Sequence, residues 1–530
     1  MNTVRAASAG TIDRPVAAAA SRSQHDHFVA PSPPDDEEKY SYVHRDLLYL
    51  ATVISIGSVC LAYSQLRLEI HDLALAPFGA FTIIYIVYQT LTLPVNFAGK
   101  GFDLDAHKTR VMSWCPPAYP DVDIYLPICG EPITLLHNTW TAVAGLIEHY
   151  PGHIQAHVLD DSASEAAQSM ARRLAAEFGY QYIRRPDWPE HKKSGNLRYA
   201  FSQTSAEFIV ILDADFAPRP DFLAETLPYM DDPSTAIVQT PQFFRTDPAQ
   251  TWVERAAGPI QEVFYRAVQV ARNRLDAAVC CGTSAVYRRA ALAPQGGPTS
   301  ISYAEDVHTG LDVRRAGWSM TYVPILLSTG ICPDNLDAFV RQQYRWCSGN
   351  VGIVFSKRLW SIPMSIPARL TYVSGFLYYA CTALLTFFGP AIPIVMLAFL
   401  PDQVRLRNFI ALLPAMLTGF VLYPLWHRAR FGPGIWPLGI VRGWAHVFAI
   451  WDGVRGESMG WQPTRTPGSS WPRFRIGIRW WSGSTAVLWT GMAIWRMATS
   501  GSLQFAILLF FGLLNLAMIA RIIFPGEAAA

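Results

Sequence analysis

Acidic pairs at the ends of apolar stretches are the residues of this chain best suited to chemistry. The strongest signal is the run Ile211–Asp215, with sequence ILDAD, in which the apolar residues end in two carboxylates one residue apart. At the carboxyl edge of a parallel sheet, such a pair suits a hard divalent cation that also bridges two phosphates. Asp213 and Asp215 are therefore predicted metal ligands. The competing interpretation is an acidic turn, with which many strands end.

Two further acidic pairs follow the same logic. Asp160 and Asp161 end an apolar run, where a carboxylate can accept hydrogen bonds from a nucleobase or a ribose. The alternative is a cap for the helix expected over 162–178. Glu305 and Asp306 form the other pair, and a carboxylate beside an acceptor hydroxyl can serve as a general base. Asp306 is the predicted base and Glu305 its supporting partner, against the alternative of a helix start.

An arginine and a tryptophan stand together in the run Gln342–Trp346, with sequence QQYRW. The guanidinium of Arg345 can clamp a diphosphate through two parallel hydrogen bonds as negative charge grows on it. The indole of Trp346 offers a flat apolar face on which a sugar ring can stack. Arg-Trp at a membrane interface is also an ordinary anchor, so this run alone does not decide between the two roles.

Short apolar runs and polar helical stretches alternate between residues 100 and 335. The runs are Val122–Pro127, Ala156–Leu159, Phe208–Leu212 and Ala236–Gln239. The helical stretches include 163–178 and 192–203. Such alternation predicts βαβ units on a mostly parallel sheet, which would bring the acidic pairs to one edge.

Apolar character on both sides of this domain predicts membrane helices. The chain is 51% hydrophobic and 16% charged, and its apolar residues are unevenly spread. Stretches long enough to cross a bilayer occupy 46–64, 72–95, 368–400, 408–426, 482–498 and 502–524. A hairpin loop is expected at 66–72. The stretch 368–400 is long enough for one kinked span or for two, so we expect six spans, with seven as the alternative. With six spans, the basic residues at 427–430 and 465–479 lie on the cytosolic side, as the positive-inside rule prefers.

Two stretches, 337–360 and 436–458, mix Trp, Phe and Ile with Arg and Asp and are expected to lie at the membrane surface. The alternative is ordinary surface helices of the α/β domain. The predicted organisation is a disordered cytosolic tail (1–44), two transmembrane helices (45–95), the α/β domain (100–335), an interfacial helix (336–365), transmembrane helices (366–426), an interfacial helix with a loop (427–481) and two transmembrane helices (482–525).

Charge and cysteine content exclude several classes of partner. The formal net charge is +2 and no dense basic stripe is present, which argues against nucleic acid. The eight cysteines are scattered without a CxxC pair, so zinc and a disulfide framework are not expected.

Taken together, Asp-Asp, Asp-x-Asp, Glu-Asp and Gln-x-x-Arg-Trp occur in this order across one domain between apolar segments. The chain thereby resembles the processive family 2 glycosyltransferases, above all the bacterial cellulose synthase catalytic subunit, and more loosely the hyaluronan and chitin synthases. The resemblance covers roughly 120–470. Its further motifs are Leu126–Pro132 (first-strand uracil pocket), Lys193–Leu197 (Lys-Ala-Gly-Asn type), Val238–Pro241, Cys281–Val286 and Trp461–Thr466 (gating loop).

The resemblance implies a role for each matching residue. Those facing UDP would be Pro127, Glu131, Asp160, Asp161, Lys193, Asp213, Arg345 and Thr464. Those facing the acceptor or its channel would be Cys281, Gly282, Thr283, Gln342 and Trp346. Asp306 and Glu305 would be catalytic, with Mg²⁺ or Mn²⁺ at Asp213 and Asp215.

Four departures from the family pattern are visible. Phe216 stands where a metal-assisting His is usual, Cys129-Gly130 where the first strand carries Tyr-Asn, and Thr466 where the gating loop has Lys, with Arg465 beside it. Only 526–530 follow the last predicted span, so no cyclic-di-GMP-sensing domain is expected. These departures weaken the prediction of an ordinary cellulose product more than that of the chemistry.

The implied fold is an α/β glycosyltransferase-A-type (nucleotide-diphospho-sugar transferase) domain inserted between transmembrane α-helices. The implied function is inverting, processive synthesis of a β-glucan, with β-1,4 favoured, from UDP-glucose, with export across the cytoplasmic membrane and a cytosolic catalytic domain. The alternatives are a β-1,3 or mixed-linkage glucan, a chitin- or hyaluronan-like polymer, transfer of one sugar to a lipid acceptor, and a non-catalytic membrane scaffold. Accessory export subunits stay open.

Overall fold

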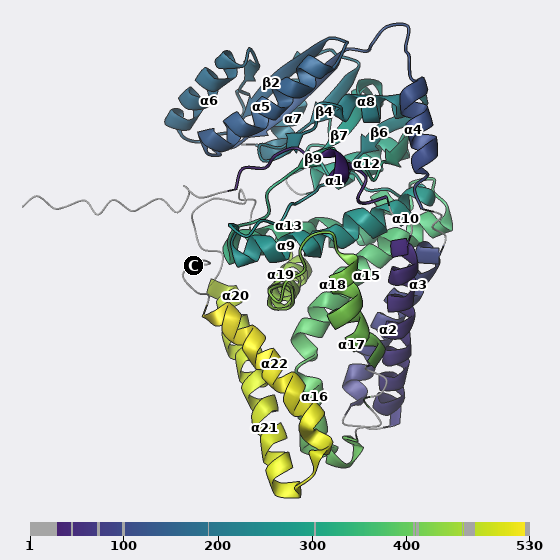
Figure 1. The fold of residues 1–530 in the computed structure, drawn as a ribbon, viewed down its shortest axis with the longest axis vertical. Coiled ribbons are helices and arrows are strands. Elements are labelled where there is room, and N and C mark those ends of the chain that lie inside the picture. The colour runs from purple at the N-terminus through teal and green to yellow at the C-terminus, as the bar shows by residue number, and fades with distance from the viewer. Residues whose placement is uncertain are drawn as a thin grey trace, which may run out of the picture.

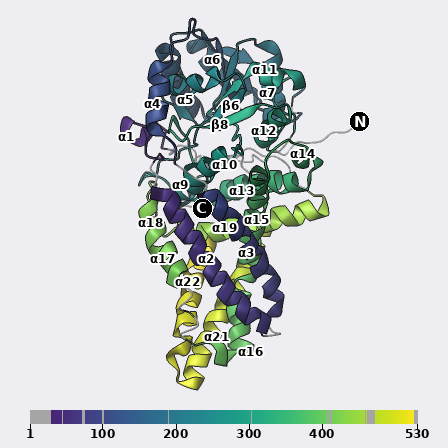
Figure 2. The ribbon, with the colours of Figure 1, turned by 90° about the vertical axis from the view of Figure 1, so that its right-hand side faces the viewer.

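The protein consists of an α/β domain at one end and a set of long helices at the other (Figure 1). The computed structural model describes residues 29–43, 46–71, 75–97, 101–188, 190–301, 304–405, 409, 413–457, 459 and 472–524. A view turned by a quarter shows the same division, with the long helices projecting from one side of the domain (Figure 2).

A seven-stranded mixed sheet forms the centre of the α/β domain. Its strands are β1 (Val122–Ile128), β2 (Ile154–Asp160), β3 (Gln181–Ile183), β4 (Phe208–Ile211), β6 (Thr235–Gln239), β7 (Ala285–Arg288) and β8 (Ser319–Tyr322). They lie in the order β3-β2-β1-β4-β7-β6-β8. Strands β1 to β4 are mutually parallel, β7 is antiparallel to both of its neighbours, and β8 is parallel to β6. The predicted sheet is therefore present, but it is mixed.

The chain crosses from one side of β1 to the other between β3 and β4, because β2 and β4 flank β1. In open α/β sheets, ligands bind outside the carboxyl ends of the strands at such a point. A two-stranded ribbon of β5 (Ala217–Pro218) and β9 (Ser328–Thr329) follows β4 at the same edge.

Helices cover both faces of the sheet, since the strands are apolar on both sides. On β1, Ile124 and Leu126 pack with Trp140 of one helical layer, while Tyr125 faces Leu197 of the other. The domain's helices are α4 (Leu104–Ser113), α5 (Ile133–His149), α6 (Glu165–Glu177), α7 (Lys192–Gln203), α8 (Phe222–Thr226), α11 (Arg289–Leu292) and α12 (Glu305–Arg315).

Helices α9 and α13 lie between the α/β domain and the long helices, with α19 beneath them (Figure 1). A shared core joins these layers and includes Phe244 near the sheet edge, Phe339 of α13 and Trp444 of α19. The bounds here are α9 (Trp252–Val263), α10 (Gln269–Arg274), α13 (Leu336–Phe355), α14 (Lys357–Trp360), α19 (Ile435–Arg455) and α20 (Pro472–Ile476). Both stretches predicted as interfacial are thus helical, while their position at a membrane surface remains a prediction.

The predicted spans are largely helical. The long helices and their short companions are α2 (Asp46–His71), α3 (Ala76–Phe97), α15 (Ile366–Phe388), α16 (Ala391–Phe399), α17 (Leu413–Leu417), α18 (Tyr423–Trp426), α21 (Ser484–Ser500) and α22 (Ala506–Ile523). In the described part of the chain, two helices are long and apolar enough to cross a membrane, Ile366–Phe388 and Leu503–Ile523. The count of six or seven spans therefore remains a prediction.

Two expectations about this helical part are corrected or resolved by the structure. The loop expected at 66–72 is helical as far as His71, where Gln65 donates a hydrogen bond to Glu69 one turn later and so supports the helix. The stretch 368–400 breaks after Phe388, at Gly389 and Pro390, because proline cannot continue the helical hydrogen-bond ladder.

The tail expected to be disordered over 1–44 is instead folded over 29–43, which we call the strap. It contains the short helix α1 (Asp36–Lys39), started by a capping box between Asp35 and Glu38. The Lys39 ammonium is buried against Asp221 at 2.7 Å and Glu225. The acidic composition suggested disorder, but these charges have partners far along the chain.

Candidate active site

The carboxyl end of β4 presents Asp213 and Asp215, both half-buried. The backbone N–H of Asp213 donates to the hydroxyl of Thr283 at 2.9 Å, and that of Ser284 donates to the carbonyl of Ile211 at 2.9 Å. The turn before β7 therefore fixes the backbone from which the two carboxylates project.

Lys193 joins the start of α7 to this edge. Its ammonium donates to Asp213 Oδ1 at 2.5 Å and to the carbonyl of Gly282 at 3.1 Å. The Lys193 and Asp213 side chains are 22% and 33% exposed, so a ligand has access to both. Burial opposes the charged ammonium, but Asp213 and Glu305 prevail and raise the pKa of Lys193 above its ordinary value. Lys193 is thus a fixed positive charge, suited to phosphate oxygens.

Asp306 lies against the same turn. It is the second residue of α12, and its Oδ1 accepts a hydrogen bond from the backbone N–H of Val307 at 2.8 Å. Gly282 has a φ of +75°, and a Cβ at that position would be 2.9 Å from the Cβ of Asp306. Glycine is therefore required here both for its backbone conformation and for this close approach. Asp213, Lys193, Gly282 and Asp306 form one contiguous cluster.

The electrostatics of the cluster prepare Asp306 to exchange a proton. Burial and the neighbouring carboxylate of Glu305 raise the pKa of Asp306 to about 7, against the lowering effects of the Val307 N–H and of Lys193. A carboxyl whose pKa lies near the working pH is well suited to act as a general base. The charge of Asp213 also raises the pKa of Asp306, by a smaller amount.

Helix α13 brings Arg345 to the cluster. Burial lowers the pKa of its guanidinium, while the nearby carboxylates of Glu305, Asp213 and Asp306 act to raise it. The helix approaches closely because a Cβ on Gly349 would lie only 2.4 Å from the Cβ of Ala304. Of the predicted acceptor residues on α13, Gln342 and Trp346 are both half-buried.

The predicted acceptor turn is held from beneath by one buried amide. Gln239, at the end of β6, accepts from the backbone N–H of Cys281 at 2.8 Å and donates to the carbonyl of Thr283 at 2.9 Å. Gln242 donates to the carbonyl of Cys281 at 3.1 Å. The turn Cys281–Thr283 is therefore rigid beside Asp306.

Unusual backbone conformations accompany the site segments. The described non-glycine residues with positive φ are His191, Lys192, Asp276, Ser284 and Ala304. Apart from Asp276, each lies next to Lys193, the Gly282 turn or Glu305. Such conformations cost about 1–3 kcal/mol each and persist where the surrounding structure enforces them, often at functional sites.

The two carboxylates predicted to hold UDP are engaged with the protein itself. Asp160 accepts from the backbone N–H of Ser162 at 2.7 Å and from the Tyr182 hydroxyl at 2.5 Å. Asp161 receives two parallel hydrogen bonds from Arg185, at 3.0 and 3.1 Å. The alternative of a helix cap is wrong, because Ser164 caps α6. Contact of either carboxylate with a nucleotide stays a prediction.

The remaining predicted donor residues lie at the end of β1. Pro127 is a buried strand residue, and Glu131 accepts from the backbone N–H of Cys129 at 2.6 Å. Thr464 and the rest of Trp461–Thr466 lie outside the described residues. Sequence reasoning missed Arg185 and Gly349, neither of which stands in a motif of its own. Gln239 lies within the Val238–Pro241 motif, but the sequence assigned it no individual role.

The donor atoms fit a divalent cation shared with a substrate. No group of three His, Cys, Asp or Glu side chains able to hold a metal occurs among the described residues. Asp213 and Asp215 are hard oxygen ligands, and Mg²⁺ is commonly held by one or two carboxylates together with phosphate oxygens and water. Phe216 is buried in the core below and cannot add a ligand.

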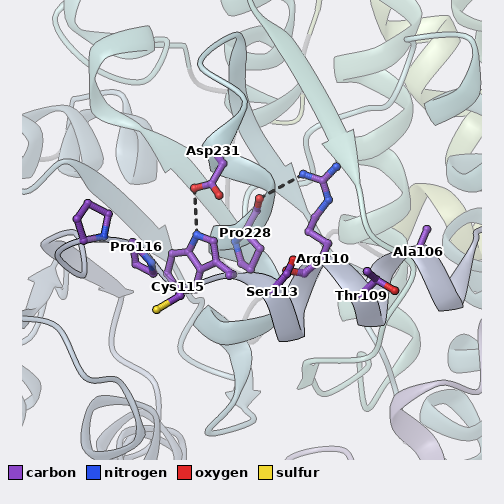
Figure 3. A pocket seen from close by; sticks show the side chains of 10 residues that line it. Ala106, Thr109, Arg110, Ser113, Cys115, Pro116, Pro228 and Asp231 are labelled. Atoms are coloured by element: carbon purple, nitrogen blue, oxygen red, sulfur yellow. Dashed lines mark hydrogen bonds between the residues drawn. The ribbon is translucent and has the colours of Figure 1, made fainter.

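A separate pocket of about 770 Å³ lies along α4, away from these residues (Figure 3). Trp114 donates to Asp231 at 3.0 Å and Arg110 to the carbonyl of Pro228 at 3.3 Å in its wall. None of the predicted site residues lines it.

Residues 208–423 match the family described as glycosyl transferase family group 2. The chain carries a family 2 glycosyltransferase domain. The match begins at β4 and includes Asp213, Asp215, Asp306 and Arg345. Cellulose synthase 1 of Komagataeibacter xylinus is 32% identical over 353 residues, which are 65% of this chain and 21% of that protein. The cellulose synthase catalytic subunit [UDP-forming] of Pseudomonas fluorescens is 33% identical over 238 residues, 44% of this chain and 31% of that protein.

The predicted relationship of this glycosyltransferase domain to bacterial cellulose synthases is thereby confirmed. The chain spans less than half the length of these curated relatives. Among solved structures, the mannosyltransferase PcManGT of Pyrobaculum calidifontis, in complex with GDP-Man and Mn²⁺, is 18% identical with a TM-score of 0.44, over 70% of this chain and 99% of that one. The structure of residues 1–349 of S. aureus TarS is 11% identical with a TM-score of 0.33, over 64% of this chain and 94% of that one.

Proposed function

We propose that this chain is a membrane-embedded, inverting, processive glycosyltransferase that builds a β-glucan, with β-1,4 linkage favoured, from UDP-glucose and moves it across the membrane. The observation that carries the proposal is the cluster in which Lys193 bridges Asp213 and Gly282 while Asp306 packs on Gly282. Around this one turn lie an ammonium suited to phosphate oxygens, a carboxylate suited to a divalent cation, and a carboxyl whose pKa of about 7 suits a general base.

The donor's diphosphate would lie between Lys193 and Arg345, with Asp213 and Asp215 at its other side. Lys193 and Arg345 both lie near carboxylates, and the diphosphate would replace part of that negative charge. When bound, Mg²⁺ or Mn²⁺ at the two aspartates would neutralise charge on the phosphate oxygens and ease departure of UDP.

Asp306 would remove the proton from the terminal hydroxyl of the growing chain. The hydroxyl oxygen then forms a bond to the anomeric carbon from the side opposite UDP. The bond from that carbon to the diphosphate oxygen breaks, and UDP leaves with the electron pair. Arg345 and Lys193 stabilise the negative charge on the departing group. The product is β-linked because the α-linked donor is inverted.

The acceptor would rest on the turn Cys281–Thr283 and against Gln342 and Trp346 of α13. This helix lies between the α/β domain and the long helices (Figure 1), which is where a polymer leaving the site would pass. A sugar ring stacked on an indole can slide, because stacking needs no fixed hydrogen bonds.

The lipid bilayer is the proposed environment of the long helices, with the domain on the cytosolic side of the cytoplasmic membrane. Besides the two helices of sufficient length and hydropathy, large apolar side chains lie exposed on several helices, among them Val87, Leu385, Trp495 and Phe510. Exposed apolar surface of this kind marks contact with lipid or protein.

The test is incorporation of sugar by the purified protein in nanodiscs. The protein would receive UDP-glucose or UDP-N-acetylglucosamine with Mg²⁺ or Mn²⁺, and the product would be sized and digested with linkage-specific glucanases. Long cellulase-sensitive polymer from UDP-glucose is the expected result. Cellulase-resistant polymer would replace the linkage, and a single sugar on a lipid would overturn processivity. A protein that neither hydrolyses nor transfers any UDP-sugar would overturn the enzymatic function.

A further inference from the structure

Trp188 is a partly exposed aromatic residue in the loop between β3 and α7, and Lys193 is the second residue of α7. Its side chain is 39% exposed, yet its indole N–H donates to the carbonyl of Asp161 at 2.9 Å. An indole that is anchored at one edge and partly open to solvent offers a flat apolar surface whose position is fixed.

Two arginines hold this loop in place. Arg184 lies over the indole at 5.6 Å from the ring centroid and donates to the carbonyl of Ser162 at 3.0 Å. Arg185 is tied to Asp161 and donates to the carbonyl of Lys192 at 3.2 Å. One face of the ring therefore has a cationic neighbour, and the orientation of the ring is set before any ligand arrives.

The indole lies at the carboxyl edge of the sheet, next to the proposed diphosphate site. The backbone N–H of Asp161 donates to the carbonyl of Ile128 at 2.9 Å, and the Cys129 thiol lies 3.7 Å from the same Asp161 carbonyl that Trp188 binds. The ends of β1 and β2 and the Trp188 loop thus meet at one peptide group. Helix α7, which follows this loop, carries Lys193.

The end of β1 contributes no ring of its own at this place. It carries Cys129 and Gly130, and a Cβ on Gly130 would meet nothing closer than the Ser162 hydroxyl at 3.9 Å. Side chains therefore do not crowd the position of the missing Gly130 Cβ, and the nearby aromatic surface at this edge is that of Trp188, which binds the same Asp161 carbonyl that the Cys129 thiol approaches.

Resting on the function proposed above, we propose that Trp188 is the surface on which the uracil ring of the sugar donor stacks. The uracil would lie against the open face of the indole, with the ribose directed along the loop and the diphosphate reaching Lys193. Stacking of a base on an aromatic side chain is favourable for every base, so hydrogen bonds from elsewhere must select uracil. Trp188 accordingly sets donor affinity and takes no part in proton transfer.

The experiment compares Trp188→Ala and Trp188→Phe in the full chain purified in nanodiscs. We expect Trp188→Ala to weaken binding of UDP, measured by calorimetry, about tenfold to a hundredfold. The KM for UDP-glucose rises by the same factor and kcat stays within about twofold. Inhibition by uridine weakens in parallel, whereas inhibition by inorganic pyrophosphate does not. Trp114→Ala is the matched control, since Trp114 also anchors its indole N–H to an acidic residue, Asp231.

Trp188→Phe separates stacking from anchoring, because phenylalanine keeps a flat ring and loses the hydrogen bond to Asp161. Near-normal UDP affinity in this variant is expected. Equal losses in both variants would show that Trp188 only fixes the loop, and unchanged affinity in both would remove it from the site; either result overturns the proposal. Wild-type protein that binds UDP but makes no product would refute the proposed function while leaving the stacking proposal standing. Wild-type protein that binds no UDP would refute both.

Discussion

Replacing Asp306 by asparagine tests the assignment of the base with little disturbance of the fold. Asparagine has nearly the same shape, so the contact with Gly282 is kept. Its side-chain oxygen can still accept the hydrogen bond from the Val307 N–H. What is lost is the ability to take a proton. General-base catalysis contributes about 10²- to 10⁴-fold to rate, so we expect kcat to fall by that factor, roughly 3–5 kcal/mol in the barrier.

The pH dependence gives an independent measure of the same group. Because the pKa of Asp306 is raised to about 7, the wild-type base is mostly protonated below that pH. The rate should therefore fall about tenfold per pH unit below pH 7 and level off above it. Glu305→Gln removes the neighbouring charge that raises this pKa, so its profile should shift toward lower pH. Asp306→Asn should show no such acid limb.

The assay is single-turnover transfer from radiolabelled UDP-glucose, which isolates chemistry from product movement. Binding of UDP should be nearly unchanged in Asp306→Asn, since the carboxylate does not bind the diphosphate in the proposed mechanism. An Asp306→Asn protein that retains more than a tenth of the wild-type rate would refute the assignment. Full loss accompanied by a large fall in thermal stability would show a structural role instead.

Other substitutions test the supporting contacts. Gly282→Ala should lower stability by about 1–3 kcal/mol, since alanine is strained at this φ, and should reduce kcat by displacing Asp306; normal thermal unfolding and activity would contradict both. Arg185→Met leaves Asp161 buried without its partner. The free energy of unfolding, measured by urea titration, should therefore fall by about 3–5 kcal/mol. The KM for UDP-glucose should also rise. Lys39→Met removes the buried cation of the strap, so we expect the free energy of unfolding to fall by about 3 kcal/mol. Protease cleavage near residue 35 should accompany this loss. An unchanged digestion pattern would show that the strap is held by other contacts.

Those parts of the site that depend on local sequence were predictable. Asp213 is predicted from a carboxylate directly after an apolar run, and Asp306 from its pairing with Glu305, and each signal is contained within a few residues. The bond between Lys193 and Asp213 was not predictable, since it depends on the register of two elements that meet only in the folded sheet. The close approach of Gly349 to Ala304 depends in the same way on how α13 crosses the start of α12.

The acidic residues were harder to assign because a carboxylate suits several roles. The sequence leaves both a nucleotide ligand and a helix cap open for Asp161, but in the fold its partner is Arg185 on the neighbouring loop. The strap shows the same difficulty, since its acidic run has the composition of a disordered segment. Its partners Arg219 and Arg245 are about two hundred residues away, and no pattern in the sequence links them.

The strap also constrains the order in which the protein can form during synthesis. Residues 29–43 leave the ribosome early, but Arg245 pairs with Glu38 across 207 positions, and Leu326 donates its backbone N–H to the carbonyl of Lys39. At about 5–20 residues per second, the wait for Arg245 is roughly 10–40 s. Docking of the strap is therefore a late step that closes a nearly finished domain, and a nascent chain halted before residue 219 would carry it as an unpaired acidic arm.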